Sequence, residues 1–392
     1  MTRYFADELM DGFRHLGFRS VVFDARHNTG ADLCQMGKGE YAFVFGINGV
    51  FTEKDIPKKI VDALVEKGTV FVAAMVDHPC HHRRRLDCFP ENTIVLFPDH
   101  KHVSYARQFY SGKAVFGFLP HGGCQMGMAF GKKVCEREKE LVFAGSYYDV
   151  RKYEDTIAQM EPATRDFMRK CIGLLREKPY LTVEQAMSVV LYGEEAVCES
   201  GTGLPIDFSE KSNSDILLFL EEYIRTDVRG RVIKSIVEHG QTIHVYGAGW
   251  ETFTCDNMEK FVWEGEAEFC ALSRVLDDTK LFLNVMPWFK DGSHERVFTA
   301  MLHGAVVLSD ESGYLEENFQ DGEEIHFYSL DRLKLLGAQI KKILKEEEKL
   351  ESIRKKAFEK TVAAHLWEHR AREILSLVKK TNETGEKRGE LL

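Results

Sequence analysis

The sequence has no apolar run close to the ~18–20 residues that a helix needs to cross a bilayer. Its nine cysteines are scattered and never spaced Cys-x-x-Cys, which favours free thiols over a disulfide scaffold. Internal repeats and low-complexity tracts are also lacking. Residues 1–18 are amphipathic and charged, without the apolar core of a signal peptide. We therefore expect a reduced, cytoplasmic protein with no transmembrane segment.

Positive charge is in deficit as well. Lys and Arg number 52 and Asp and Glu 62, which gives a formal net charge of −10. This balance, together with the lack of a basic aromatic stripe, argues against a nucleic-acid binder. Hydrophobic residues make up 44% and charged residues 29% of the chain, as in ordinary globular proteins. A chain of 392 residues then has room for two or three domains.

Short apolar runs alternate with helical patterns, which is typical of α/β architecture. Because the runs are apolar throughout, we expect parallel sheets that helices cover on both faces. The expected strands of the first half are residues 20–24, 41–47, 69–76, 93–97 and 114–119. Those of the second half are residues 141–144, 242–246, 281–285, 305–309 and 324–328. A helix precedes the first strand, so the first domain either lacks its first strand or begins upstream.

Polar and helical segments suggest the domain organisation. The charged stretch 131–140 is interpreted as a linker, and the mostly helical segment at about 151–239 as an insertion in the second domain. A long charged helix is expected from 333 to about 377, with a break near residue 365. The expected parts are residues 1–135, residues 136–350 and, as a final helix and polar tail, residues 351–392. The picture is two Rossmann-like domains facing each other across a cleft.

Glycine turns follow two expected strands of the second domain. In open parallel sheets, ligands bind at the carboxyl ends of strands. Gly145 and Ser146 follow strand 141–144, and Arg151, six residues after Gly145, could hold a phosphate. Three further candidates follow strand 242–246, namely Gly247, Gly249 and Trp250. A tight βα connection without a ligand is the alternative, and the third glycine of a dinucleotide fingerprint is absent.

A helix start follows strand 281–285. We expect Asp291 or Ser293 to cap a helix over about 294–303, whose N-terminus would suit a diphosphate. Arg296 would add a charge-assisted bond. The candidate residues of this anion site are Gly292, Ser293, His294, Glu295 and Arg296. The alternative is an ordinary capped helix in which Glu295 favours the dipole and Arg296 is exposed.

Two histidines at strand ends are the candidates of the first domain. Asp77 and His78 follow strand 69–76, and His121 follows strand 114–119, so all three could line a cleft. The run 78–88 also contains further His and Cys residues, but its spacing matches no closed zinc pattern. A metal site is therefore not expected.

Three segments carry a resemblance to a known family: HVYGAGW (244–250), FKDGSHERVFTAMLHGAVVLSD (289–310) and DGEEIHFYSL (321–330). The closing AHLWEHRAREIL (364–375) adds to it, and residues 77–79, 119–123 and 141–149 match more weakly. The chain resembles GT-B glycosyltransferases, and within them the CgeB-like type of spore maturation and flagellin modification. This implies an α/β fold of the GT-B type, whose C-terminal helix crosses back to the N-terminal domain.

The resemblance assigns roles to individual residues. In retaining enzymes of this class, an acidic residue by the donor sugar is followed, after seven residues, by a Glu that holds the ribose. Asp291 occupies the first position, whereas Thr299 replaces the Glu. The family's Gly-Arg pair, followed five residues later by Lys, becomes Gly145–Ser146 and Arg151, and we expect Arg296 to supply the missing cation.

The same resemblance implies a metal-independent glycosyltransferase with no tightly bound cofactor. The donor would be a nucleotide-diphosphate sugar, with a UDP-sugar favoured, and the acceptor a surface glycan or a flagellin-like protein. His78 would help to position the donor sugar or relay a proton, while Asp77 steadies the His78 ring. The resemblance favours retention of configuration; an inverting enzyme would use His121 or Asp77 as base. The alternatives are a nucleotide-sugar epimerase and, because of Thr299, an inactive nucleotide-sugar-binding or assembly protein.

Overall fold

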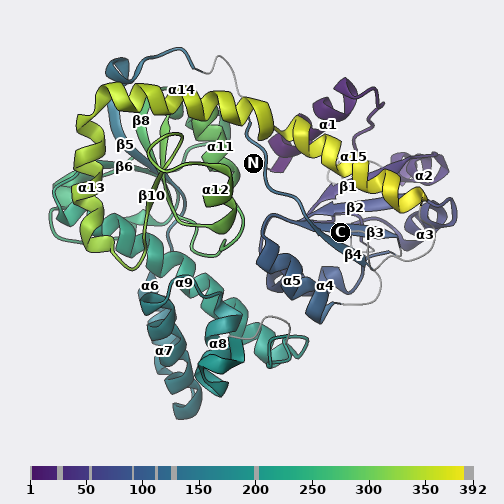
Figure 1. Cartoon of the computed structure of the whole chain (residues 1–392). Coiled ribbons are helices and arrows are strands. Elements are labelled where there is room, and N and C mark those ends of the chain that lie inside the picture. The colour runs from purple at the N-terminus through teal and green to yellow at the C-terminus, as the bar shows by residue number, and fades with distance from the viewer. Residues whose placement is uncertain are drawn as a thin grey trace. The chain divides into compact units, whose positions relative to one another are not determined.

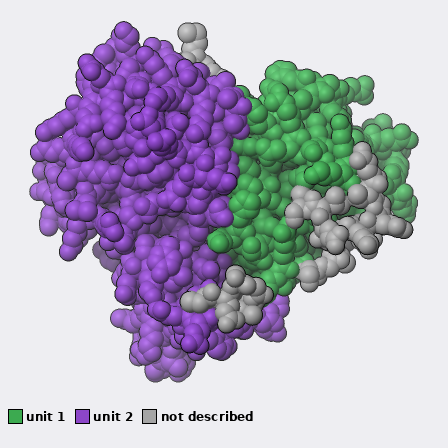
Figure 2. All heavy atoms as spheres, in the orientation of Figure 1, with its two compact units in different colours: residues 1–122, 366–392 green, residues 123–365 purple. Residues whose placement is uncertain are grey.

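The computed structural model describes residues 2–23, 30–52, 55–90, 92–110, 114–124, 130–197 and 203–383. The chain forms two compact units, coloured separately in Figure 2. Unit 1 comprises Met1–Gly122 and Leu366–Leu392, and unit 2 comprises Gly123–His365. Each unit contains one parallel sheet with helices, so the predicted α/β class with two parallel-sheet domains is confirmed (Figure 1). None of the helices in the described ranges is long and apolar enough to span a membrane.

The sheet of unit 1 follows the order of the chain, β1-β2-β3-β4, and all its pairings are parallel. Its strands are β1 (Phe43–Ile47), β2 (Val70–Ala74), β3 (Thr93–Phe97) and β4 (Ala114–Phe118). Every residue of β2 and β3 is buried, as expected for strands that are covered on both faces. These four strands confirm four of the five predicted in this half.

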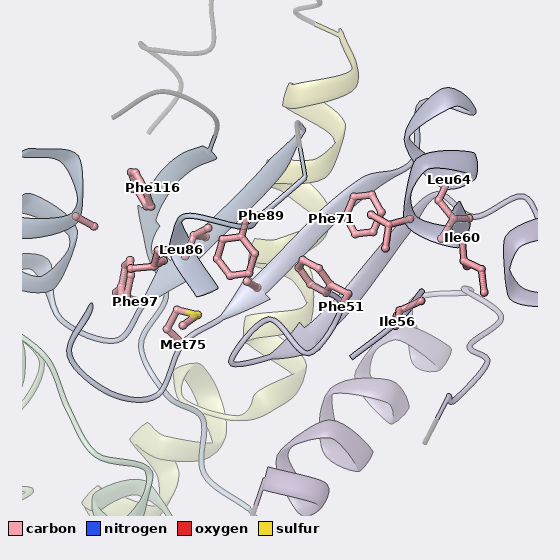
Figure 3. Close-up of a cluster of buried hydrophobic side chains, with 14 of the residues drawn as sticks. Phe51, Ile56, Ile60, Leu64, Phe71, Met75, Leu86, Phe89, Phe97 and Phe116 are labelled. Carbon is pink, nitrogen blue, oxygen red and sulfur yellow. The ribbon is translucent and has the colours of Figure 1, made fainter. Parts of the chain in front are cut away.

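Phenylalanine rings and aliphatic side chains together form the core of unit 1 (Figure 3). The ring of Phe51 lies 5.1 Å from that of Phe71 on β2 and 5.6 Å from that of Phe89, measured between centroids. Helix α3 (Lys58–Glu66) adds Ile60 and Leu64, which share one helix face because they are four residues apart. The four-residue spacing of Ile60 and Leu64 therefore accounts for the buried face of this helix.

The predicted strand at residues 20–24 is wrong. Residues 20–23 are irregular, and Asp24 lies outside the described residues. The side chains of Val21 and Val22 are 56% and 63% exposed. A strand of this composition gains stability only when one of its faces is buried, so the short apolar run was an insufficient signal.

The remaining helices of unit 1 include both ends of the chain. Helix α1 (Thr2–His15) packs against α15 (Trp367–Glu383), and the ring of Phe5 lies 5.0 Å from that of Trp367. The other helical segments are α2 (Gly30–Lys38), η1 (Pro79–His82), α4 (Arg83–Leu86) and α5 (His100–Phe109). A C-terminal helix thus completes the unit that the N-terminal residues begin.

The sheet of unit 2 has the order β10-β9-β8-β5-β6-β7, again with parallel pairings. Its strands are β5 (Lys139–Ala144), β6 (Ile243–Tyr246), β7 (Phe261–Trp263), β8 (Thr279–Asn284), β9 (Val306–Asp310) and β10 (His326–Tyr328). After β5 the chain adds β6 and β7 on one side of it and then β8, β9 and β10 on the other side, so the strand order reverses at β5. The five predicted strands are confirmed, and β7, which has only three residues, was not predicted.

Helices separate these strands, and four of them form the predicted helical insertion between β5 and β6. The insertion consists of α6 (Val150–Ala158), α7 (Pro162–Glu177), α8 (Val183–Tyr192), the short η3 (Glu194–Val197) and α9 (Lys211–Glu238). The other helices are α10 (Phe269–Asp277), α11 (Glu295–Leu302), α12 (Gly313–Asn318), α13 (Leu333–Lys345) and α14 (Glu347–Ala364). Short 3-10 helices are η2 (Val134–Glu136), η4 (Trp250–Thr252) and η5 (Met258–Lys260). Figure 1 shows α7 and α8 extending away from the sheet, whereas α9 leads back toward it.

Two further predictions need correction. The stretch 131–140 is not a simple linker, because β5 begins at Lys139 and the buried guanidinium of Arg137 donates hydrogen bonds to the carbonyls of Leu276, Thr279 and His303. Charge alone therefore did not mark an exposed segment. The long C-terminal helix does break near residue 365, as expected, but it breaks at Glu346 as well.

Candidate active site

The carboxyl ends of β5, β6 and β8 meet at one edge of the unit 2 sheet. Strand β5 pairs with β6 on one side and with β8 on the other, and the strand order reverses at this point. Connections that leave such a point on opposite sides of the sheet leave a crevice for a ligand. The glycine turns after β5 and β6 and the loop after β8 therefore share this edge.

The two glycine turns lock onto each other. Gly145 N donates to Tyr246 O at 2.8 Å, and Trp250 Nε1 donates to Gly145 O at 2.8 Å. Gly249 has a φ of +84°, and a Cβ there would lie 1.9 Å from Tyr147 O. Side chains would thus collide with the opposite turn, which accounts for these glycines without a ligand.

Gly247 is equally confined, since a Cβ there would lie 2.4 Å from Gly145 O. The indole of Trp250 is buried and stacks on the Tyr147 ring with centroids 4.7 Å apart. Trp250 therefore supports the turn from within. The carbonyl of Ser146 accepts a hydrogen bond from the Arg229 guanidinium on α9.

Arg296 places a cation at the end of β5. Its side chain is buried, Nη1 donates to Ala144 O at 2.6 Å, and a Cβ on Gly145 would lie 3.2 Å from Nη1. Burial lowers the pKa of Arg296, aided by the charge of Arg225, and the charges of Glu295 and Asp310 oppose this. The alternative in which Arg296 is exposed is wrong.

His294, and not Asp291 or Ser293, caps α11. Its Nδ1 accepts from Arg296 N at 3.4 Å and lies 3.1 Å from Arg296 Nε, and its ring also contacts Glu295. The imidazole nitrogen thus contacts both the backbone and the guanidinium of Arg296, the second residue of the helix.

The loop before α11 is held by the turn that follows β9. Ser312 Oγ donates to Gly292 O at 2.7 Å, and Gly313 N donates to Lys290 O at 2.9 Å. Asp291 is half-buried next to Gly313, where a Cβ would lie 2.8 Å from its Oδ1, and Ser293 is fully buried. Asp291 is thus fixed close to the helix start.

Thr299 and Arg151 are both engaged within the chain. The hydroxyl of the buried Thr299 accepts from Cys124 N at 3.2 Å. The Arg151 side chain is 68% exposed and grips Asp149, with Nη2 2.8 Å from Oδ2 and Nε 2.9 Å from Oδ1. The cation expected from Arg151 is therefore paired with its own neighbour.

Sequence reasoning missed two arginines of the insertion. Arg229 on α9 is buried and donates from Nη1 to Ser146 O at 2.7 Å. The guanidinium carbons of Arg225 and Arg229 lie 4.5 and 4.9 Å from the centre of the Trp288 ring. Their spacing of four residues, which places both on one helix face, was a signal that the sequence did contain.

Asp310, the last residue of β9, is a further missed residue. It is buried, and its Oδ1 and Oδ2 lie 2.9 and 3.0 Å from Met286 N, which donates to them. Burial raises the pKa of Asp310 to about 7, against the opposing effects of that hydrogen bond and of the Lys290 and Arg296 charges. The edge thus contains a carboxyl group that changes its charge near neutral pH.

In unit 1, His78 is packed from several sides. Its Nδ1 accepts from Cys80 N at 3.2 Å, which caps η1, and its ring is edge-on to His102 and Tyr105 at 4.6 and 4.7 Å. Asp77 is half-buried, and its charge opposes the lowering of the pKa of His82. His78 follows β2 as predicted, in a buried setting.

His121 follows β4 and lies under α15. Its ring lies 6.2 Å from those of Phe5 and Trp367, and Arg370 Nε donates to its carbonyl at 3.3 Å. A Cβ on Gly122 would lie 2.6 Å from Trp367 N, so this turn requires a glycine. Across the described parts of both units, no group of three or more His, Cys, Asp or Glu is placed to hold a metal ion.

Residues 225–376 match a family model described as glycosyl transferase-like. The match begins at Arg225 and includes Trp288, Asp291, Arg296 and Asp310. The chain therefore contains a glycosyl transferase-like region, in agreement with the resemblance seen in the sequence. No curated protein matches the chain.

Solved structures of similar architecture are distant. TarM of S. aureus, solved with UDP, is 12% identical over 88% of this chain and 58% of that chain, with a TM-score of 0.47. Anabaena HepE, solved with UDP and glucose, is 9% identical over 89% and 80%, with a TM-score of 0.48. AviGT4, from avilamycin A biosynthesis, is 12% identical over 96% and 88%, with a TM-score of 0.49.

The chain spans just over half the length of the first matched structures, 54% for TarM and 56% for the GtfA/B complex. Because all of these TM-scores lie below 0.5, the assignment rests on the family match and on the sheet edge described above.

Proposed function

We propose that the protein is a GT-B glycosyltransferase that takes a sugar from a UDP-sugar. One observation carries the proposal. Arg296, in the first turn of α11, places a buried guanidinium against Ala144 and Gly145 at the carboxyl end of β5. The glycosyl transferase-like match over residues 225–376 supports it.

The chemistry of the leaving group explains why a cation belongs here. When the bond between sugar C1 and the phosphate oxygen breaks, negative charge grows on the diphosphate. The N-terminus of α11 and the Arg296 guanidinium stabilise that charge in a buried setting. Because these groups do the work of a divalent ion, the reaction is metal-independent.

Asp291 orients the donor sugar from the loop that precedes α11. The turn at Ser312 and Gly313 holds this loop, so the carboxylate is positioned before the sugar arrives. Thr299 stands where the resemblance leads us to expect a ribose-binding Glu. Because a threonine replaces that Glu, the ribose is bound without a carboxylate from this position, and the Thr299 hydroxyl accepts from Cys124 N.

Unit 1 binds the acceptor, a surface glycan or a flagellin-like protein. His78 and His121 are the residues of unit 1 that we assign to the site. The reaction retains configuration. The acceptor hydroxyl forms the new bond to C1, and its proton passes to the departing phosphate oxygen. No protein base is then required for the acceptor.

A panel of UDP-, GDP-, CDP- and dTDP-sugars tests the proposal by thermal shift and nucleotide release. UDP-sugars should stabilise the protein by mass action and release UDP slowly in water. Asp291→Ala should abolish release without lowering the melting temperature. A divalent-ion chelator should leave the rate unchanged, and NMR of the product should show retained anomeric configuration. A folded sample that no nucleotide sugar stabilises would refute the proposal.

The engagement of the Thr299 hydroxyl favours one second candidate, a nucleotide-sugar-binding protein without transferase activity. It predicts stabilisation by UDP-sugar with no UDP release, even when glycan acceptors are present. An epimerase would instead change the sugar and keep the nucleotide attached. The same panel therefore separates all three.

A further inference from the structure

Helix α9 of the insertion brings two guanidiniums to the edge of the unit 2 sheet at which β5, β6 and β8 end. Arg225 and Arg229 lie one turn apart, and both guanidinium carbons are within 5 Å of the Trp288 ring centre, at 4.5 and 4.9 Å. Cation–π attraction of this kind fixes the orientation of a guanidinium without neutralising its charge. Trp288 thus holds two cations in place and adds no counter-charge of its own.

Arg229 is the more deeply placed of the two. It is 6% exposed, and its Nη1 donates to Ser146 O, the residue that follows Gly145 in the turn after β5. Its Nε is buried and has no hydrogen-bond partner within the described ranges of the chain. Burying a guanidinium with an unsatisfied N–H is costly unless an anion joins it.

Positive charges accumulate around Arg229. Burial lowers its pKa well below the ordinary range, and the charges of Arg296 and Arg225 lower it further, against the charge of Asp310. Asp310 itself has a pKa of about 7 and is only partly ionised at neutral pH. A group with two negative charges would relieve the repulsion between these guanidiniums.

We infer that Arg229 is a second ligand of the donor's diphosphate, positioned by Trp288, and that the helical insertion therefore supplies part of the nucleotide site. The inference rests on the proposed function and adds to it. Arg296 approaches the diphosphate from α11, and Arg229 approaches it from α9, on the other side of the turn at Gly145 and Ser146. The charge-assisted bonds of an arginine suit the paired oxygens of a phosphate.

Calorimetry with UDP, UMP and uridine tests this assignment on the full chain. Arg229→Gln should weaken UDP binding by about 10- to 100-fold, as for a lost hydrogen bond between charged groups. The loss should be smaller for UMP, and uridine should bind as it does to the wild type. Arg231→Gln is the matched control, because Arg231 lies on α9 with a side chain that is 38% exposed. It should leave all three affinities unchanged.

Two further variants separate a ligand from a structural role. Arg229→Lys keeps the charge and should restore part of the UDP affinity. Trp288→Leu should weaken UDP binding less than Arg229→Gln does, and Trp288→Phe should recover it. Without ligand, Arg229→Gln should melt at or above the wild-type temperature, because a buried charge has been removed. A lower melting temperature with unchanged discrimination between UDP and UMP would overturn the inference.

The remaining outcomes distinguish this inference from the proposed function. If Arg296→Gln loses UDP affinity while Arg229→Gln keeps it, the inference fails and the proposed function stands. If the wild type binds inorganic pyrophosphate through Arg229 but no nucleotide, the proposed function fails and the diphosphate ligand stands. Binding of neither UDP nor pyrophosphate would overturn both.

Discussion

The sheet of unit 1 adds its strands one after another in chain order, whereas the sheet of unit 2 grows from β5 in both directions. In unit 1 each connection leads to the next strand, and the described order contains no reversal. In unit 2 the connections after β5 and β8 lead away from each other, which is the arrangement at which open α/β sheets bind ligands. Two sheets of the same class thus differ in where a ligand can bind, and the difference lies in the strand order.

The buried polar groups of the two units differ in the same sense. Unit 2 buries Arg229 and Arg296 at the edge where its strand order reverses. Unit 1 buries His78 and His102 edge-on to each other, with Tyr105 against His78. Arginine keeps its positive charge at neutral pH, so the edge of unit 2 buries cationic groups. Unit 2 is the unit that we propose for the diphosphate, and unit 1 the one that we propose for the acceptor.

Replacing one buried polar side chain in each unit with glutamine would test this contrast most strongly. Arg296→Gln should lower kcat/KM by about 10²- to 10³-fold, as for other lost donors to a developing oxyanion, and should weaken UDP binding. His121→Gln should lower turnover and leave UDP affinity unchanged. Steady-state kinetics measures turnover and calorimetry measures UDP affinity. A loss of UDP affinity in His121→Gln would contradict the proposal that only unit 2 binds the nucleotide.

Asp310 should make unit 2 less stable as the pH rises. Its pKa is about 7 in the folded state and near 3.8 when unfolded, so its protonated form stabilises the fold and that contribution is lost between these values. Asp310→Asn should become more stable than the wild type as the pH increases, by up to about 4 kcal/mol above pH 7. Urea unfolding at pH 5 and pH 8 measures this, and equal differences at both pH values would disprove it.

Two glycines, one in each unit, have similar positive φ angles but differ in the space around them. Gly249 in unit 2 has a φ of +84°, and a Cβ there would lie 1.9 Å from Tyr147 O, whereas Gly68 in unit 1 has a φ of +75° and open space. Gly249→Ala should cost on the order of 3 kcal/mol, and Gly68→Ala about 1 kcal/mol. Denaturant unfolding of the two variants checks the difference, which should vanish if the turns of unit 2 are not interlocked.

His82 gives unit 1 the opposite and smallest pH response. Burial lowers its pKa below 6.5, helped by the charges of Arg85 and His78 and opposed by that of Asp77. The unfolded chain binds the proton more readily, so stability falls as the pH drops below about 6.5. His82→Gln should lessen the loss of stability between pH 6.5 and pH 5, and an unchanged acid limb would count against this account.

Much of the fold could be predicted because parallel strands buried on both faces leave continuous apolar runs. Nine of the ten expected strands are present. The run at residues 20–24 has the same composition but exposes Val21 and Val22, and burial cannot be seen in so short a segment. Strand β7 was missed for the reverse reason, since three residues at a sheet edge carry no pattern.

Candidates for the site could be named only where a residue lies close in sequence to an expected strand end. Gly145 and Arg296 were named in this way. Arg229 was not, because it lies far along the insertion and reaches Ser146 only through the path of α9. Arg151 satisfied the expected spacing and yet pairs with Asp149, so spacing identified a cation but not its partner. Which charge faces which loop is a property of the packing.

The packing of α15 against α1 determines the order in which the two units can fold during translation. Unit 1 needs segments from both ends of the chain, whereas unit 2 is continuous in sequence. On a ribosome, all of unit 2 emerges before Trp367 can cover Phe5. At ~5–20 residues per second, α1 waits roughly 20 to 70 s for its partner helix. Unit 2 can therefore fold during translation, and α15, which is made after unit 2, completes the unit to which α1 belongs.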